Sequence, residues 1–314
     1  MNILSKIIIV VVISIVIYAS FLIISDVSSI SDEFSNFQFE YLPIIIASLT
    51  SAYFSLILRW NILLKKSAIK IPKSSSILIF MSGVSLSLIP GKVGELIKSE
   101  LLKTKFNIPR AKSAPIVVVE QIYTAIGLII TSFFGLYYFD LSIYIIIAFS
   151  IILTLIFLFL SSEKLFQKLS KIFLKIKFLN RFAENISESH VVIKKLISGK
   201  FVISLISLST LFWVLVSTSV YFIILAFGIN DFEYFAIWTM YTSSVMLGFM
   251  SFLPIGIGVV EGSFAGFMAY QGIDISVALT LIIIVRLLVE WLPICAGFIS
   301  LKIIYSKKSI SDKN

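Results

Sequence analysis

The sequence predicts an all-α membrane protein that crosses the bilayer several times. Of its 314 residues, 59% are hydrophobic and only 14% are charged, and the mean hydropathy is +1.05, far outside the range of soluble domains. Six apolar runs have about the 20 residues that a helix needs to cross the hydrocarbon core. They fall at about 7–24, 41–64, 114–136, 142–160, 201–228 and 277–301. We therefore expect one transmembrane domain over 1–314 with six spanning helices, the first of them uncleaved.

Two further apolar segments are interrupted by proline and glycine. They cover 76–102 and 235–270, and break at Pro90-Gly91 and at Pro254, with Gly256 and Gly258 just after. Lipid cannot satisfy the N–H and C=O groups that such a break frees, so both breaks are expected to be buried in protein or to line a watery cavity. Each segment is predicted to be a re-entrant hairpin or a pair of short tilted helices. The count would reach eight helices if both segments span.

The basic residues predict the orientation. Lys and Arg near the ends of spans are retained in the cytoplasm. With the N-terminus inside and both interrupted segments returning to their own side, all but two of the 26 basic residues fall in inner segments. The two exceptions are Arg59 and Arg286, which lie within spans. We expect a multi-pass protein of the cell membrane with both termini cytoplasmic. The net charge of +9 then indicates contact with anionic lipid and no nucleic acid partner.

The stretch 161–200 is predicted to be a basic cytoplasmic loop. Within it, 163–182 places leucines and isoleucines on one helical stripe and lysines on another, which indicates an amphipathic helix lying in the membrane interface. The lone His190 follows in a polar stretch and is expected to be solvated. With one histidine and one cysteine, Cys295, no His or Cys metal cluster is expected, and no cofactor is predicted.

The order of span, span, broken hairpin and span occurs twice. Glu95 of the first broken segment lies 25 residues before Glu120, and Glu261 of the second lies 25 residues before Arg286. The charge pattern puts the first hairpin on the inner face and the second on the outer face. The sequence therefore predicts an inverted-topology repeat, with 5–140 as the first repeat and 141–303 as the second, the plan of many transporters.

Charged residues within the apolar segments indicate a polar site. Each costs about 2.5–3.5 kcal/mol in the membrane unless it is paired or wetted. Arg286 and Glu290 lie four residues apart and could pair with each other. Glu95, Glu120 and Glu261 are expected to find partners across the bundle, with Arg286 as a partner of Glu261 or Glu120. We expect a cavity between the hairpins, shared by Glu95, Glu261 and Arg286.

Glycines beside these carboxylates suggest a binding site for an anion. A helix that starts at Gly91 or Gly258 would present its positive end to a phosphate. The alternative, that each Gly-x-x-Gly is a helix-packing contact, stays open.

The motifs PGKVGE, LPIGIGVVEGSF and VRLLVEWLPICAGFISL resemble the transmembrane flippase region of lysylphosphatidylglycerol synthases and its stand-alone relatives, the flippase-like domain family. The resemblance covers roughly 5–303 and implies movement of a lipid with a polar head between leaflets. The positions that match the family motifs are Pro90, Gly91, Gly94, Glu95, Pro254, Gly256, Gly258, Glu261 and Arg286. Where family members commonly have Glu-Arg, this chain has Glu120-Gln121. The missing arginine favours a singly charged or zwitterionic phosphate over a diphosphate.

The expected function is a lipid flippase for a phosphate-bearing polar lipid, such as an aminoacyl-phospholipid or a polyprenyl-phosphate sugar, and not an enzyme. A membrane-embedded transferase with a lipid-linked donor and a small-solute transporter stay as alternatives. The candidate substrate-binding residues are Pro90, Gly91, Gly94, Glu95, Glu120, Gln121, Pro254, Gly256, Gly258, Glu261, Arg286 and Glu290. Expected partners are membrane lipids and a lipid-modifying synthase or glycosyltransferase. The sequence leaves open the lipid, the direction of transport and the oligomeric state.

Overall fold

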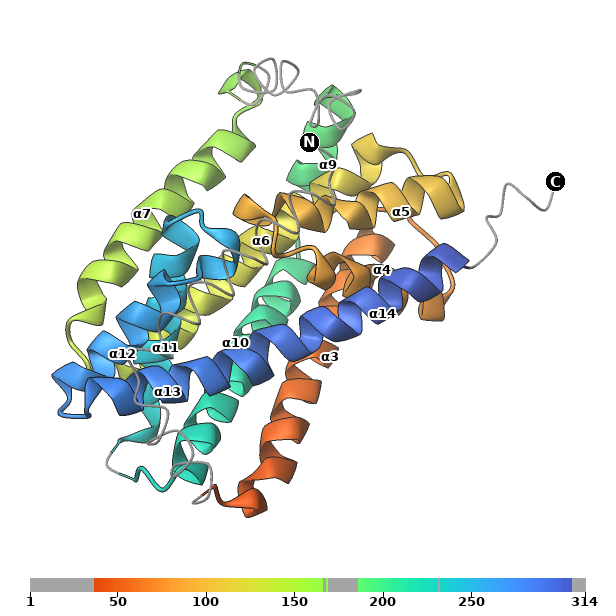
Figure 1. Cartoon of the computed structure of the whole chain (residues 1–314). Helices are drawn as coiled ribbons and strands as arrows, with labels where there is room; N and C mark the ends of the chain where they lie inside the picture. Colours follow the sequence, from red (N-terminus) through yellow and green to blue (C-terminus); the bar gives the residue numbers. More distant parts are fainter. Residues whose placement is uncertain (1–36, 166–167, 169–185, 231, 307–314) are drawn as a thin grey trace.

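The computed structural model describes residues 37–165, 168, 186–230 and 232–306, and every regular element in them is helical (Figure 1). Five stretches are long and apolar enough to cross a membrane: Phe39–Lys66, Arg110–Gly135, Ser142–Ser161, Phe201–Ala226 and Ile275–Ser306. Five of the six predicted spans are thereby confirmed. The predicted span 7–24, and all but a few residues of the predicted interfacial helix 163–182, lie outside the described residues.

The described elements are, in order, η1 (Phe39–Tyr41), α3 (Leu42–Lys66), α4 (Lys73–Ser85), η2 (Pro90–Leu96), α5 (Ile97–Phe106), α6 (Arg110–Ser132), η3 (Phe133–Gly135), α7 (Ser142–Ser161), α9 (Ile186–Leu196), α10 (Phe201–Ala226), α11 (Tyr234–Met250), η5 (Pro254–Gly256), α12 (Val259–Tyr270), α13 (Ile275–Arg286), the π-helical turn η6 (Leu287–Trp291) and α14 (Leu292–Ser306).

Small residues let the central helices approach closely. α10 packs along α3 on one side and α6 on the other. The Ser55 hydroxyl of α3 donates to the carbonyl of Leu208 at 3.2 Å. A Cβ on Gly127 of α6 would lie 2.5 Å from the carbonyl carbon of Ser209, so only glycine fits there. Such close backbone contacts supply the packing energy that the hydrophobic effect cannot provide between helices in lipid.

Both interrupted segments form broken hairpins, as the prolines predict. α4 and α5 pack against each other, as do α11 and α12. Their lengths of 13, 10, 17 and 12 residues all fall short of the roughly 20 that a span requires. Regular helix therefore stops inside the protein at each break.

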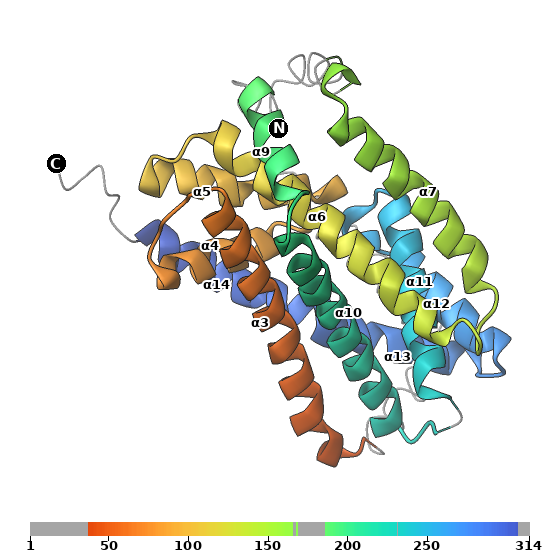
Figure 2. The same cartoon turned by 180° about the vertical axis from the view of Figure 1, so that it is seen from behind.

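The two hairpins lie at opposite ends of the long helix formed by α13, η6 and α14 (Figures 1 and 2). α4 packs on α14, while α12 packs on α13. The Lys105 amine at the end of α5 donates to the carbonyl of Tyr305 near the end of α14, at 3.0 Å. At the other end, the ring of Phe267 on α12 lies 4.9 Å from that of Phe139. This opposed placement is what an inverted plan requires, and the repeat boundaries 5–140 and 141–303 stay a prediction.

The prediction of a solvated His190 is wrong. The residue lies on α9, and its side chain is buried where α9 packs against α6. Pro115, inside α6, has no N–H to give to the carbonyl of Ala111, and the hydroxyl of Ser189 donates to that carbonyl instead, at 3.2 Å. Part of the loop 161–200 is therefore a helix docked on the bundle.

The long helix contains a π-helical turn at Leu287–Trp291, followed closely by Pro293. Pro293 cannot donate to the carbonyl of Val289, four residues earlier, and the Tyr53 hydroxyl of α3 donates to it weakly at 3.5 Å. Single π turns inside α-helices are frequent at functional sites. At its start the helix is capped by Asp274, and the hydrogen bonds from Ser276 hold the pKa of this exposed carboxyl below its usual range.

α7 lies at the edge of the bundle in both views (Figures 1 and 2). Only 17% of its most apolar window is buried, the lowest share among the five spans. Its exposed residues are large and apolar, such as Tyr144, Leu155 and Leu158. In a protein of this composition, that face lies against lipid chains.

Candidate functional site

The two breaks meet in the interior. η2, which begins at Pro90, contacts η5, which begins at Pro254. Gly94 allows the backbone of the first break to fold back against Leu86, because a Cβ on Gly94 would lie only 1.9 Å from the carbonyl oxygen of Leu86. Gly256, with φ of 69°, adopts a left-handed conformation that suits glycine. Two segments far apart in the sequence thus bring irregular backbone to one place.

The first break carries a buried network around Lys98. The Lys98 amine lies 2.8 Å from Glu95 and 2.7 Å from Glu120 of α6. The Gln121 amide donates to Glu95 at 3.0 Å. Arg59 of α3 lies 3.9 Å from the other oxygen of Glu120. With these groups ionised, two cations balance two carboxylates.

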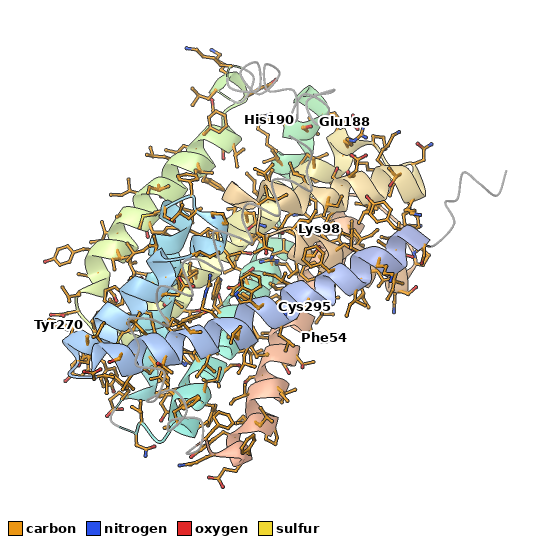
Figure 3. The ribbon with its side chains drawn as sticks, in the orientation of Figure 1. Phe54, Lys98, Glu188, His190, Tyr270 and Cys295 are labelled. Carbon is orange, nitrogen blue, oxygen red and sulfur yellow. The ribbon has the colours of Figure 1, made fainter. Side chains whose placement is uncertain are left out.

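Lys98 is enclosed on all sides. Its side chain is 1% exposed, and Figure 3 places it in the interior of the helical bundle. The amine lies 5.3 Å from the ring centroids of both Trp60 and Phe80. The alkyl stem packs against Gly83, where a Cβ would come within 2.7 Å of it. A buried lysine needs such compensation, because an isolated ammonium in a dry interior costs many kcal/mol.

Arg59 and Glu120 also have polar atoms that the hydrogen bonds of this network leave unused. The Nη1 atom of Arg59 donates to the hydroxyls of Thr124 at 2.9 Å and Ser209 at 2.8 Å. Its Nε atom and the Oε1 atom of Glu120 are buried without a hydrogen-bond partner. Buried polar groups are normally satisfied, so these atoms indicate a place for water or a polar ligand.

The second break carries a smaller network around Arg286. Its Nε atom donates to Glu261 of α12 at 2.9 Å, and its Nη2 atom donates to the carbonyl of Ile255 at 2.6 Å. Glu290, on the π turn, lies 3.4 Å from the Nη1 atom. Arg286 thus contacts both carboxylates. Glu290 is 24% exposed, whereas Glu261 is fully buried.

Glu261 also caps its own helix. Its second oxygen accepts a hydrogen bond from the N–H of Gly258 at 2.7 Å, at the start of α12. This carboxylate therefore occupies the helix N-terminus that the sequence assigned to a substrate phosphate. At the first break, a 3-10 helix begins at Pro90, next to the predicted helix start at Gly91, and the α-helix begins only at Ile97.

Two cavities adjoin these networks. The wide cavity has a volume of about 210 Å³ and is lined by residues that include Arg286, Glu290 and Gly256. The narrow cavity has a volume of about 80 Å³, and its lining includes Arg59, Glu95, Lys98 and Glu120. Both are lined by Ser87, Gln121, Trp213 and Glu290. The charged networks of the two breaks therefore line two neighbouring cavities, which together we call the polar region, although most of the other residues that line the wide cavity are apolar.

The structure brings most of the predicted site residues together. Glu95, Glu120, Gln121, Arg286 and Glu290 line one or both cavities. The pairing of Arg286 with Glu261 is as predicted, and so is the contact of Arg286 with Glu290. Glu261 lines neither cavity and acts behind Arg286. Pro90, Gly91, Gly94, Pro254, Gly256 and Gly258 shape the two breaks.

Lys98 and Arg59 are part of this site but are not among the predicted site residues. Lys98 falls in a basic inner segment of the predicted topology, and Glu95 is predicted to find its partner across the bundle. The spacing of three between Glu95 and Lys98 within one helical turn was the signal for this pair. Arg59 stands within an apolar span, and an ionisable residue there indicates a functional site by itself.

Comparison with known proteins shows the family of this chain. Residues 8–297 match the family described as the lysylphosphatidylglycerol synthase TM region. The chain belongs to this family. The match includes both breaks and the long helix through Arg286, so the whole site lies within the family region.

Two relatives are described as UPF0104 membrane proteins. One, from Methanocaldococcus jannaschii, is 28% identical over 206 residues, which cover 64% of this chain and 86% of the relative. The other, from Methanothermobacter thermautotrophicus, is 31% identical over 108 residues, which cover 34% of this chain and 31% of the relative. The second match thus spans about a third of that protein's length.

Gln121 stands where the resemblance described above implies the arginine of a Glu-Arg pair. The amide reaches Glu95 at 3.0 Å, so it keeps a hydrogen bond without adding a charge. Lys98 and Arg59 already balance Glu95 and Glu120. Among the described residues, Glu95 and Glu120 therefore have cationic partners without an arginine at this position.

Proposed function

We propose that this protein moves a polar membrane lipid between the two leaflets. The observation that carries the proposal is the meeting of the two broken hairpins at a charged region with cavities inside a bundle of apolar helices. Hairpins that enter from opposite ends give such a region a path to either leaflet in turn. Family membership supports the same reading, because the family region is the membrane part of a lipid synthase.

Recognition of the lipid would use the contact between Arg286 and Glu290. At 3.4 Å it is longer than the 2.9 Å bond to Glu261, and both residues line the wide cavity. A phosphate in the wide cavity would compete with Glu290 for the guanidinium, which binds phosphate well. Glu290 would then be free to receive an ammonium or hydroxyl group of the same lipid. A phosphate-bearing lipid, zwitterionic or rich in hydroxyls, matches this exchange.

The protein would act without chemical conversion of the lipid, alongside a lipid-modifying synthase or glycosyltransferase that makes it. A membrane-embedded transferase and a small-solute transporter would use the same cavities differently. A transferase changes the mass of its lipid, and a solute transporter moves a water-soluble molecule. Both outcomes are separable from lipid translocation in one reconstituted system.

The test uses proteoliposomes that contain a headgroup-labelled lipid and an impermeant quencher. We expect the parental protein to speed translocation of a phosphate-bearing lipid over an uncharged analogue of equal chain length. Arg286→Gln should reduce this difference about tenfold, because it removes the donor to phosphate at a cost of roughly 1.4 kcal/mol in transition-state stabilisation. Glu100→Gln is the control, since Glu100 pairs with Arg110 outside both cavities. Equal rates for both lipids in every variant would contradict the proposal.

We further propose that the lysine-rich ends of the helices face the cytoplasm. Lys66 donates to the carbonyl of Ser198, and Lys105 donates to that of Tyr305, so each of these lysines lies beside another basic segment that is distant in sequence. In a Cys295→Ser background, a cysteine at exposed Asp274 should react with an impermeant thiol reagent in intact cells, and one at exposed Lys200 should not. The reverse pattern would overturn this orientation.

A further inference from the structure

A third cavity lies beside the polar region and differs from it in character. It has a volume of about 350 Å³ and lies between η2, α6, α7 and α11. All of its lining side chains are apolar except Gln121. Water in such a space would lack hydrogen-bond partners, so an apolar occupant is favoured. We call this space the apolar compartment.

The apolar compartment is open towards the surrounding lipid. Its lining includes Val118 of α6 and Ile152 and Ile156 of α7, which are 38%, 40% and 44% exposed. α7 is also the least buried of the five spans. Lipid chains therefore reach the opening between α6 and α7 without crossing a polar surface.

The apolar compartment adjoins the wide cavity and shares part of its lining. Gln121, Phe249 and Phe252 line both spaces. Gln121 also lines the narrow cavity, and its Oε1 atom is buried without a hydrogen-bond partner. This amide stands at the boundary between charged and apolar space. A molecule that fills both the wide cavity and the apolar compartment needs a polar part and a hydrocarbon part that join beside Gln121.

We propose that the apolar compartment holds one hydrocarbon chain of the transported lipid while its headgroup lies beside Arg286 and Glu290. The inference rests on the proposed lipid translocation and adds to it a binding site for the chain. A small solute would leave the larger of the two spaces empty, whereas an amphiphile fills both. The opening between α6 and α7 is then the lateral path by which the chain enters.

Phe252 stands at this boundary in a strained conformation. Its φ of 55° lies in the left-handed region, which costs a bulky residue of order 1–3 kcal/mol. Its neighbour across the break, Ile255, has φ of 42°. Both residues flank Pro254 and line the wide cavity. The wall between the headgroup and chain spaces is thus built on a segment, 252–255, that holds two bulky residues in left-handed backbone conformations.

The first experiment fills the apolar compartment from its opening. Ile152→Trp and Val118→Trp add bulk at two different helices, and Leu158→Trp is the control, since Leu158 is 56% exposed on the same α7 and lines none of the three cavities. We expect both filling variants to reduce translocation of a two-chain, headgroup-labelled phospholipid about tenfold. All three should keep the parental melting temperature, because each substituted residue is at least 38% exposed.

The second experiment locates the chain directly. A phospholipid with a photoreactive group in the middle of one chain should cross-link to Leu153 and Phe249, which are only partly exposed and line the compartment. Ile152→Trp should abolish this labelling, and Leu158→Trp should leave it intact. Labelling without any translocation by the parental protein would overturn the proposed function but keep the chain site. Translocation with no such labelling, and with filling variants as active as the control, would overturn the chain site alone.

Discussion

The two breaks have the same sequence plan but different electrostatics. At the first, Glu95 pairs with Lys98 one helical turn away, and two cations balance two carboxylates beside an 80 Å³ cavity. At the second, two carboxylates share Arg286, and Glu290 is partly exposed in a 210 Å³ cavity.

A repeated motif therefore does not carry a repeated role in this protein. The first network ties α3, α5 and α6 together and has the character of a structural lock, although buried atoms of Arg59 and Glu120 lack a hydrogen-bond partner. In the second, Glu290 is partly exposed and lines the wide cavity, where a ligand can reach it. Four predictions test this division, from the largest expected effect to the smallest.

Of the four substitutions, Lys98→Met should destabilise the folded protein most. It leaves Glu95 and Glu120 without their shared amine in a buried site, and breaking a buried ion pair in this way costs about 3–5 kcal/mol. Glu100→Gln breaks the partly exposed pair with Arg110 and should cost less than about 1 kcal/mol. Thermal unfolding in detergent compares the two. If Lys98→Met melts at the parental temperature, the first network does not stabilise the fold.

Gly94→Ala should be the next most harmful change. The added Cβ would collide with the carbonyl oxygen of Leu86, and overpacking of this kind costs about 1–3 kcal/mol. Gly262→Ala on α12 is the matched control, since nothing lies within 4 Å of its Cβ position and alanine favours helix by up to about 1 kcal/mol. The two variants should shift the melting temperature in opposite directions. Equal shifts would show that Gly94 has room.

Glu290→Gln should affect transport rather than stability. It removes the partly exposed carboxylate but leaves the bond between Arg286 and Glu261 in place. We expect translocation to fall about tenfold, or roughly 1.4 kcal/mol, with a melting temperature well above that of Lys98→Met. The proteoliposome assay and detergent melting give both values. If the variant transports at the parental rate, Glu290 takes no part in binding the lipid.

Gln121→Arg should alter selectivity by the smallest amount. The substitution adds a cation at a residue that lines both polar cavities, and Glu95 is already 3.0 Å from the amide. We expect the ratio of diphosphate to monophosphate lipid translocated to rise about threefold, or roughly 0.7 kcal/mol. Competition between the two lipids in one vesicle preparation measures this ratio. An unchanged ratio would show that Gln121 does not contribute to selection by headgroup charge.

The local features of the fold were predictable from the sequence. Hydropathy located five described spans to within a few residues, because a helix in lipid needs a fixed length of apolar side chains. Proline and glycine located both breaks, because they cannot continue a helix regularly. The cost of isolated charge in a membrane also predicted that Glu261 and Arg286 would be partners.

The partnerships and the cavities were decided only by the tertiary structure. Arg59 reaches Glu120 because α3 and α6 both pack against α10, and no spacing in the chain records that distance. His190 is buried because α9 docks on α6, although Glu188 and Ser189 just before it are polar. Glu261 is enclosed while Glu290 faces a cavity, although both are carboxylates beside Arg286. Sequence patterns fix what each residue prefers, whereas burial and pairing depend on which surfaces meet when the helices pack.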